Sequence, residues 1–496
     1  MGFGSAAPSR KRRLELSAGR QETGLMQLHE RFASPTPGLI AGVVVVQILC
    51  IAIPNLWSLA LALALSGGLL LAGYTFFSPR RTLLVALVLN IVLPVKLLFS
   101  LVLPGGLRLQ EGVLLAACLF ALIDLVYKRG LRLRVTAIDL PVLCLLAATL
   151  LSVAVGVAHG HSNSQILRDV RYPFYYAAFF LVTNFVDRRA VLELFAPALV
   201  LCGAVVGGEY ILEFLGAIDL SVGTRFVRVV RLQGMVLPLA ILLVANQFIH
   251  NPGRYGRPLL VVVMLPIGVA FVLTVGRGMW VAVGVGILCS ALLRHFSVPR
   301  AERSAWKPAL LMVGVLVVVV GATALFQRFT GAAIGAHAFQ RSLTFVDYER
   351  DVPILARLFS YATTLAAIGA RPLLGHGQGA MLNIMSIDPE TLEPEMIMAG
   401  TVDNLYLALW WKMGLAGLLA FAWFYWRVFQ RAWRAFKESR DSQVQVFAAG
   451  AVAVMSGMAV LGLSDASMVS GRFALVFAVF FAMVVVATDA DDTQTE

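Results

Sequence analysis

The chain has 496 residues, of which 59% are hydrophobic and 14% charged, and its mean hydropathy is +0.82. This composition excludes a soluble globular protein, because a soluble fold has no use for so much apolar surface. The formal net charge of +12 does not indicate nucleic-acid binding, because the charge of a membrane protein is interpreted loop by loop. The apolar runs do not alternate as barrel strands do, and many can cross ~30 Å of hydrocarbon. The sequence therefore predicts an all-α, polytopic transmembrane helical bundle.

The first segment of the chain, residues 1–37, is polar and basic, which predicts a cytoplasmic tail with no cleavable signal. About 14 membrane spans follow, with one large periplasmic loop at 327–402 between the eleventh and the twelfth. Spans 1–11 occupy residues 38–326, spans 12–14 occupy 403–488, and 489–496 form a second tail. The spans are predicted at 38–54, 56–77, 82–104, 112–127, 139–158, 172–186, 192–216, 235–249, 259–275, 279–294, 308–326, 403–426, 444–463 and 473–488.

Six short basic loops set the predicted orientation. They are 78–81, 128–134, 187–189, 250–258, 293–307 and 427–440. Because cytoplasmic loops are enriched in lysine and arginine, these loops are expected on the inside, and both termini are then cytoplasmic.

The loops predicted to lie outside contain many arginines and no lysine. These arginines are Arg108, Arg168, Arg171, Arg225, Arg228, Arg231, Arg277, Arg328, Arg341, Arg350, Arg357, Arg371 and Arg472. One interpretation is that long external loops cross the membrane regardless of charge and that acids such as Asp347 pair with some of them. The other is that the planar guanidinium groups bind phosphate or carboxylate.

Arg168 and Arg171 precede the span at 172–186 and share one face if this segment is helical. Asp169 points elsewhere and cannot neutralise both. The tyrosines that follow form either an interfacial aromatic belt or a wall for sugar or prenyl groups. Farther along, TRFVRVVRLQG (224–234) places Arg228 in the middle of a basic stripe that suits either lipid headgroups or a diphosphate.

The stretch GRGMW (276–280) holds Arg277 between two spans with almost no loop. A cation at this boundary needs either a protein acid or an anionic lipid headgroup as its partner. In the large loop, RLFSYATTLAAIG (357–369) predicts a helix that stops before Pro372. The turn GHGQG (375–379) follows, where backbone N–H groups can cradle an anion, and His376 is either an acid–base group or an ordinary loop histidine.

The last segment of interest is AGTVDNLYLALWWKMGLAGL (399–418). Asp403 either caps the helix that starts there or presents a carboxylate to the bundle, where it can accept a proton from a hydroxyl. Lys412 falls on roughly the opposite face and is not its natural partner. Gly414 and Gly417 allow close helix packing.

Three of these stretches, in this order, resemble the O-antigen ligase and polysaccharide polymerase (Wzy) family of bacterial membrane glycosyltransferases. TVGRGMWVAV (274–283) is similar to the family's Ser-Arg-Gly segment, with Gly276 where serine is usual. RLFSYATTLAAIGARPLLGHGQG (357–379) resembles its Arg…Pro-Leu-Leu-Gly-x-Gly-x-Gly segment. DNLYLALWWKMGLAGL (403–418) resembles its His-Asn-x-Tyr-Leu…Gly-Leu-x-Gly segment.

The resemblance implies a GT-C-like fold in the bacterial inner membrane and a donor glycan on undecaprenyl diphosphate. It implies inverting transfer without a metal or other cofactor. Arg277 together with Arg168 or Arg171 would hold the phosphates, and Asp403 would be the catalytic base where ligases often have histidine. The residues expected to bind substrate are Arg168, Arg171, Arg228, Arg277, Arg357, His376, Asn404 and Tyr406.

The departure at Asp403 favours a polymerase of O-antigen or exopolysaccharide repeat units over a ligase that transfers glycan to lipid A-core. A polymerase would have the lipid bilayer, the lipid-linked glycan and possible chain-length regulators as partners, and no nucleic acid. Three other classes stay open: a flippase of lipid-linked sugars, a peptidoglycan polymerase of the shape, elongation and division type, and a non-catalytic scaffold. The polar groups cluster at the outer leaflet rather than along a path through the bilayer, which argues against the flippase.

Overall fold

The computed structural model describes residues 78–94, 102–103, 107–127, 133–218, 232–250, 255–274, 276–297, 352–387 and 394–489. Every described residue belongs to the compact unit formed within residues 75–496. The spans predicted at 38–54, 56–77 and 308–326 lie outside the described residues, as does the stripe around Arg228.

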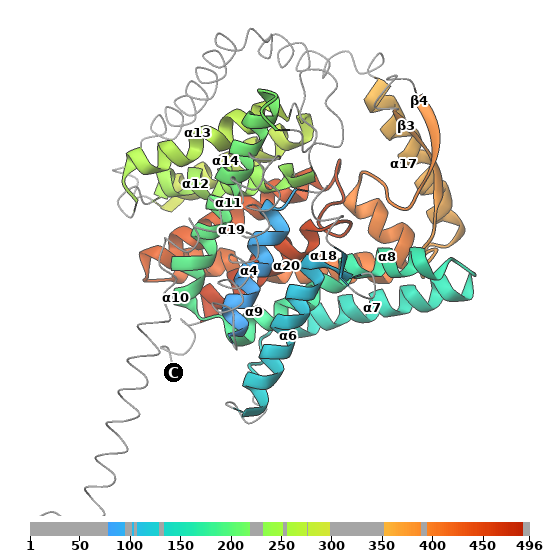
Figure 1. Ribbon diagram of the computed structural model, residues 1–496, viewed down its shortest axis with the longest axis horizontal. Helices are drawn as coiled ribbons and strands as arrows, with labels where there is room; N and C mark the ends of the chain where they lie inside the picture. Colours follow the sequence, from blue (N-terminus) through green and yellow to red (C-terminus); the bar gives the residue numbers. More distant parts are fainter. Residues whose placement is uncertain are drawn as a thin grey trace, which may run out of the picture. The chain divides into compact units, whose positions relative to one another are not determined.

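Helices dominate the described residues (Figure 1). In the first half of the chain they are α4 (Pro79–Val92), α6 (Leu109–Tyr127), α7 (Asp139–Ala158), α8 (Asn163–Phe174), η1 (Tyr175–Ala177), α9 (Ala178–Phe185), α10 (Arg188–Ala190), η2 (Val191–Phe195), α11 (Ala196–Phe214), η3 (Leu232–Met235) and α12 (Val236–His250). The later helices are α13 (Arg257–Leu273), α14 (Arg277–Ser297), α17 (Val352–Ala370), α18 (Leu405–Glu438), α19 (Ser442–Leu461) and α20 (Phe473–Asp489).

Six helical stretches among the described residues are long and apolar enough to cross a membrane. They are Asp139–Ala158, Arg188–Phe214, Gln233–His250, Arg277–Ser297, Leu405–Glu438 and Ser442–Leu461. The prediction of a helical membrane protein is thereby confirmed, while the count of about 14 spans stays a prediction. Helices α13 and α20 are also apolar, but each has 17 residues and is shorter than a full span at 1.5 Å per residue.

The structure also contains two antiparallel hairpins, which the all-α prediction missed. Strands β1 (Val102–Leu103) and β2 (Leu107–Arg108) form the first. Strands β3 (Leu382–Ile387) and β4 (Pro394–Ala399) form the second, which lies beside α17 in the large loop (Figure 1). Strands β1 and β2 have two residues each, too few for a periodic pattern, and the six-residue strands LNIMSI and PEMIMA do not alternate strictly between apolar and polar residues. The prediction for α17 is confirmed, since this helix ends at Ala370, before Pro372.

The helix that carries Arg168 and Arg171 starts earlier than the predicted span. Helix α8 begins at Asn163 and continues through Pro173 into the 3-10 turn η1 and then α9. Pro173 has no N–H to donate to the preceding turn, and the tighter 3-10 geometry follows directly after it. Both arginines are therefore helical, which meets the condition under which they share one face, and they precede the apolar part.

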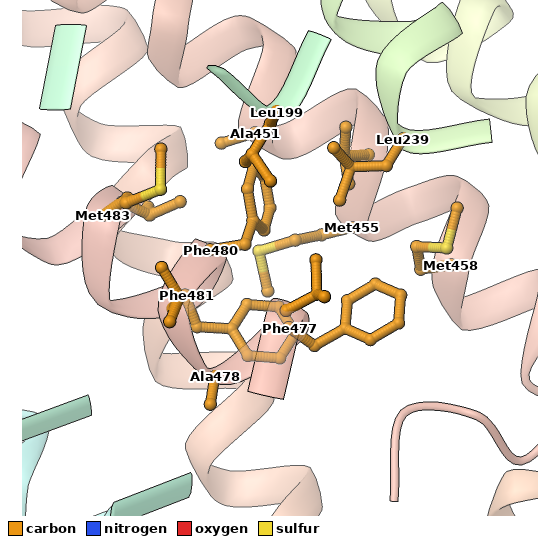
Figure 2. Close-up of a cluster of buried hydrophobic side chains, with 14 of the residues drawn as sticks. Leu199, Leu239, Ala451, Met455, Met458, Phe477, Ala478, Phe480, Phe481 and Met483 are labelled. Atoms are coloured by element: carbon orange, nitrogen blue, oxygen red, sulfur yellow. The ribbon is translucent and has the colours of Figure 1, made fainter. Parts of the chain in front are cut away.

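Helix α20 forms the centre of the apolar core. Every residue of Phe473–Thr488 is buried, which is typical of a helix that is hydrophobic on all sides. Figure 2 shows its phenylalanines packed with Met455 and Met458 of α19. The ring of Phe481 also meets that of Phe424 edge-to-face, with centroids 5.4 Å apart. In a bilayer, close packing of this kind holds helices together, because lipid tails compete equally for apolar surface.

Ion pairs join four of the six loops predicted to lie on the inner side. They connect Arg80 to Asp187 (3.0 Å), Arg188 to Asp441 (2.6 Å), Arg134 to Asp489 (3.3 Å) and Arg431 to Asp489. Loops far apart in sequence therefore meet on one side of the helices, as the basic-loop pattern requires.

Candidate functional site

Helix α18 is interrupted at the point where the large loop returns to it. Gly414 has φ 66° and ψ −172°, so the helix is two segments joined at a non-helical residue. The carbonyls of Trp411 and Lys412 accept hydrogen bonds from the amides of His376 (2.8 Å) and Gly377 (3.0 Å). The glycine loop, residues 375–379, thus satisfies carbonyls that the break releases from the helix.

The glycine loop fits only because it lacks side chains at alternate positions. Gly375, Gly377 and Gly379 all have positive φ, between 69° and 88°. A Cβ on Gly377 would lie 2.3 Å from the amide nitrogen of Gly156 in α7, which allows no substitution without movement. These glycines therefore hold the loop against α7 and α18.

The loop amides that were predicted to cradle an anion bind groups of the protein itself. The backbone amide of Gln378 donates a hydrogen bond to the carbonyl of Ser152 at 3.0 Å. Gly379 donates to the Oδ2 atom of Asp169 at 3.1 Å. The anion that the loop holds is therefore the carboxylate of Asp169.

Asp169 and Lys412 form a buried ion pair between α8 and α18. Their side chains are only 12% and 11% exposed, and Lys412 Nζ donates to Asp169 Oδ2. Arg168 adds a second cation, with its Nε 3.8 Å from Asp169 Oδ1. Lys412 is not among the predicted site residues, although its position could have indicated one, because an ionisable residue inside an apolar helix generally has a buried partner and a function.

A cavity of about 430 Å³ opens at this ion pair, and we call it the Lys412 cavity. Its polar lining consists of Arg168, Asp169, Tyr172, Gln378, Thr401, Lys412 and Ser470. Apolar residues, including Leu409 and Met413 of α18, line the remainder. Gln378 is 1% exposed, and its side-chain oxygen has no hydrogen-bond partner among the described residues.

Arg171 has a different partner from Arg168, although both lie on α8. Its guanidinium binds Oε1 of Glu111 on α6 at 2.9 Å, and the hydroxyl of Tyr175 donates to the same oxygen at 3.2 Å. Asp169 therefore does not neutralise both arginines, as predicted: it lies near Arg168, whereas Glu111 pairs with Arg171.

A second polar group surrounds Asp403, and we call Arg357, Tyr361, Asp403 and Asp465 the Asp403 cluster. The Nε atom of Arg357 lies 3.7 Å from Oδ2 of Asp403, whose side chain is 65% exposed. The hydroxyl of Tyr361 lies within hydrogen-bonding distance of the carbonyls of Asp403 (2.7 Å) and Leu463 (2.9 Å). Helix α17 of the large loop is thereby held to the start of α18.

The start of α18 is capped by Asn404 and not by Asp403. Oδ1 of Asn404 accepts hydrogen bonds from the amides of Tyr406 and Leu407, both at 3.0 Å. Its Nδ2 donates to the carbonyl of Leu463 at 3.0 Å. Of the two interpretations of Asp403, the helix cap is therefore wrong, because the amide one residue later fills that role.

Asp465, in the connection between α19 and α20, is the partly buried acid of the Asp403 cluster. Burial raises the pKa of its carboxyl above the ordinary value, while hydrogen bonds from Ser467 act in the opposite direction. The charge of Asp403 raises the pKa of Asp465 further, and the charge of Arg357 lowers it. The charge of Asp403 therefore influences the protonation of Asp465.

Arg277 is the first residue of α14 and is partly buried. The next residue, Gly278, lies so close to the α19–α20 connection that a Cβ there would lie 2.4 Å from Oγ of Ser464. The backbone at Arg277 therefore lies beside the connection that carries Asp465.

Tyr406, another predicted site residue, lies in the first turn of α18. Its hydroxyl donates a hydrogen bond to the carbonyl of Ala459 in α19 at 2.6 Å.

The remaining predicted site residues divide between the two groups or fall outside them. The Nε2 atom of the His376 ring hydrogen-bonds the carbonyl of Ala367 at 2.8 Å. This contact holds the glycine loop to α17. Arg228 lies outside the described residues. The structure thus places Arg168 in the Lys412 cavity and Arg357 with Asp403, and the segment 400–413 contributes to both.

The described helices define a helical membrane protein with one polar group at the start of α18 and another at its break. Residues 259–422 match the family model described as O-antigen ligase (Wzy_C). The matched segment includes Arg277, Arg357, Asp403 and Lys412, so the resemblance to the O-antigen ligase and Wzy-type family is confirmed. The chain is a multi-pass membrane protein, and its residues 259–422 are similar to this glycosyltransferase-like family. No curated protein matches the chain.

Proposed function

We propose that the chain is a polymerase-like glycosyltransferase that extends a polysaccharide at the periplasmic face of the bacterial inner membrane. Its donor is a glycan on undecaprenyl diphosphate, and its acceptor is a hydroxyl of another glycan. The transfer inverts the anomeric centre and needs no metal, because fixed cations neutralise the leaving group. Both chain termini are cytoplasmic in this arrangement.

The observation that carries the proposal is the position of Asp403. It stands at the start of α18 within the matched segment, its side chain does not cap the helix because Asn404 does, and its carboxylate is exposed beside Arg357. An exposed carboxylate can meet an incoming hydroxyl, and Arg357 at 3.7 Å can orient it. Arg168 lines the cavity beside α18, Arg277 is next to Gly278 at the α19–α20 connection, and both supply charge for the diphosphate in this proposal.

In the proposed reaction the acceptor oxygen attacks the anomeric carbon of the donor sugar and forms the new glycosidic bond. The bond between that carbon and the phosphate oxygen breaks, and undecaprenyl diphosphate leaves with the electron pair. The hydroxyl proton passes to the carboxylate of Asp403. Atoms and charges balance without an oxidant, a reductant or a second activated substrate.

The test is transfer by the purified full chain in lipid nanodiscs, with a radiolabelled undecaprenyl-diphosphate oligosaccharide as the donor. Products of two and more repeat lengths, with the donor as the sole glycan, support the polymerase. Glu193→Gln, on an exposed acid paired with Arg189 on the inner side, is the control variant. If the chain forms no new glycosidic bond with any acceptor offered, and instead moves the donor between leaflets, the proposal is wrong and a flippase is correct.

A ligase is the second candidate, because the matching family model carries that description. The same assay distinguishes the two enzymes when lipid A-core is added as the acceptor. Transfer to lipid A-core alone, without any lengthening of the donor glycan, assigns the chain as a ligase.

A further inference from the structure

We infer that Lys412 is a substrate-binding residue and that the Lys412 cavity takes the anionic, hydroxyl-bearing headgroup of a phosphate-linked sugar. In this account Asp169 is the counter-ion that holds Lys412 until the phosphate arrives. The inference rests on the proposed function only in taking the substrate to be a lipid-linked sugar phosphate.

The charge of the cavity lining favours an anion. Among the described residues, the charged groups that line it are Arg168, Lys412 and Asp169, which leaves one positive charge in excess. Lys412 is buried and carries its charge at the end of the first segment of α18, where the negative end of the helix dipole favours a cation. Its Nζ also lies 5.2 Å from the ring centroid of Trp411. The ammonium group of Lys412 is therefore stabilised in a poorly hydrated environment, where its attraction for phosphate oxygens is stronger than in water.

Hydrogen bonding in the cavity favours a ligand that also carries hydroxyl groups. The buried side-chain oxygen of Gln378 accepts nothing from the described residues, and a buried acceptor without a donor is costly. A phosphate oxygen cannot donate to it, but a sugar hydroxyl can. Thr401 and Ser470 add hydroxyl groups to the same lining. A sugar phosphate can meet both the cations and the hydroxyl groups of the lining, whereas an inorganic anion meets the cations alone.

The geometry at Asp169 allows Lys412 to take a second partner. The carboxylate of Asp169 retains a hydrogen bond from Gly379 at 3.1 Å and the guanidinium of Arg168 at 3.8 Å. An ammonium group has three donors, so Lys412 can bind a phosphate oxygen while its contact with Asp169 loosens. Asp169 is thus a competing negative charge, and its removal should strengthen binding of an anion.

The experiment measures binding rather than turnover, using the full chain in nanodiscs and two probes. One probe is farnesyl diphosphate, and the other is farnesyl diphosphate linked to N-acetylhexosamine. Lys412→Gln is expected to weaken both probes about tenfold or more, because a charge-assisted contact is lost, and Lys412→Arg should recover much of it. Asp169→Asn should tighten both probes. Gln378→Leu should weaken only the sugar-bearing probe. Arg189→Gln, on an exposed surface pair, is the control.

A buried ion pair whose single partner is removed destabilises a protein, so a paired variant is needed. Asp169→Asn combined with Lys412→Met removes both charges together and should fold while still losing affinity for both probes. The inference is overturned if this double variant and Lys412→Gln, both folded by thermal melting, bind the probes as the wild type does. Wild-type binding of a phosphate-free hexosamine glycoside as tight as that of the sugar-bearing probe would also overturn it. Transfer activity is measured in parallel, so that loss of Lys412-dependent binding and loss of transfer are separate outcomes.

Discussion

Gly377 donates its amide hydrogen to the carbonyl of Lys412 at 3.0 Å, across the break in α18. This contact joins the large loop, which is external in the predicted topology, to the interior of a helix long enough to cross the membrane. The same turn of α18 carries the Lys412 side chain, and the same loop holds Asp169 through Gly379. The glycine loop therefore determines where both members of the buried ion pair stand.

The first prediction concerns the close approach of Gly377 to α7. Gly377→Ala is expected to lower the melting temperature of the chain in detergent much more than Gly160→Ala does. Both glycines have positive φ, at 88° and 72°, so both substitutions cost about 1–2 kcal/mol of backbone strain. A Cβ at Gly377 meets Gly156, whereas a Cβ at Gly160 has nothing within 4 Å. Equal losses in the two variants would show that the approach to α7 contributes nothing.

The second prediction concerns the pair formed by Arg171 and Glu111. Arg171→Met is expected to destabilise the fold by about 3–5 kcal/mol, because it leaves a mostly buried carboxylate without its charge partner. Adding Glu111→Leu should restore much of the lost stability, since neither charge then needs neutralising. Denaturation in detergent of the two single variants and the double variant measures the coupling. Strictly additive losses would contradict the pairing.

The third prediction concerns the pH dependence of stability at Asp465. Because burial raises the pKa of this carboxyl, the folded chain binds its proton more tightly than the unfolded chain does. The contribution to stability is complete below a pH of about 4 and is lost as the pH rises through the raised pKa. Asparagine does not titrate, so Asp465→Asn should melt at a higher temperature than the wild type at pH 8. The difference in melting temperature between the two proteins should shrink towards pH 4. Melting temperatures that depend on pH in the same way for both proteins between pH 4 and pH 8 would contradict this prediction.

Much of the fold could be predicted from the sequence, because apolar runs and basic loops reflect the bilayer directly. The end of α17 before Pro372 and the helical setting of Arg168 likewise follow from local rules. The ion pair between Asp169 and Lys412 could not be predicted, since its members lie 243 residues apart and belong to different helices. Contacts at that separation are set by packing, which a single sequence does not display.

The break at Gly414 shows the same limit in another form. The sequence indicates a small residue for close helix packing, which is one way to use glycine in a membrane helix. In the structure, the backbone of Leu373 and Leu374 occupies the place where a Gly414 side chain would be, and a Cβ there would lie 2.1 Å from the carbonyl oxygen of Leu373. The positive φ follows from this inserted loop. The cap at Asn404, in contrast, could have been predicted from the sequence, since asparagine is a preferred N-cap residue and stands directly before the apolar run.

The proton-accepting role of Asp403 is tested most directly by the single-turnover rate of glycan transfer, with wild type and Asp403→Ala both saturated with the lipid-diphosphate donor. The account predicts that Asp403→Ala slows the transfer by about 10²–10⁴-fold, as expected for loss of a general base, with donor affinity and melting temperature unchanged. Asp403→Glu should retain part of the rate. A folded Asp403→Ala chain that transfers glycan within about threefold of the wild-type rate would contradict the account, because such a rate leaves no room for a base at this position.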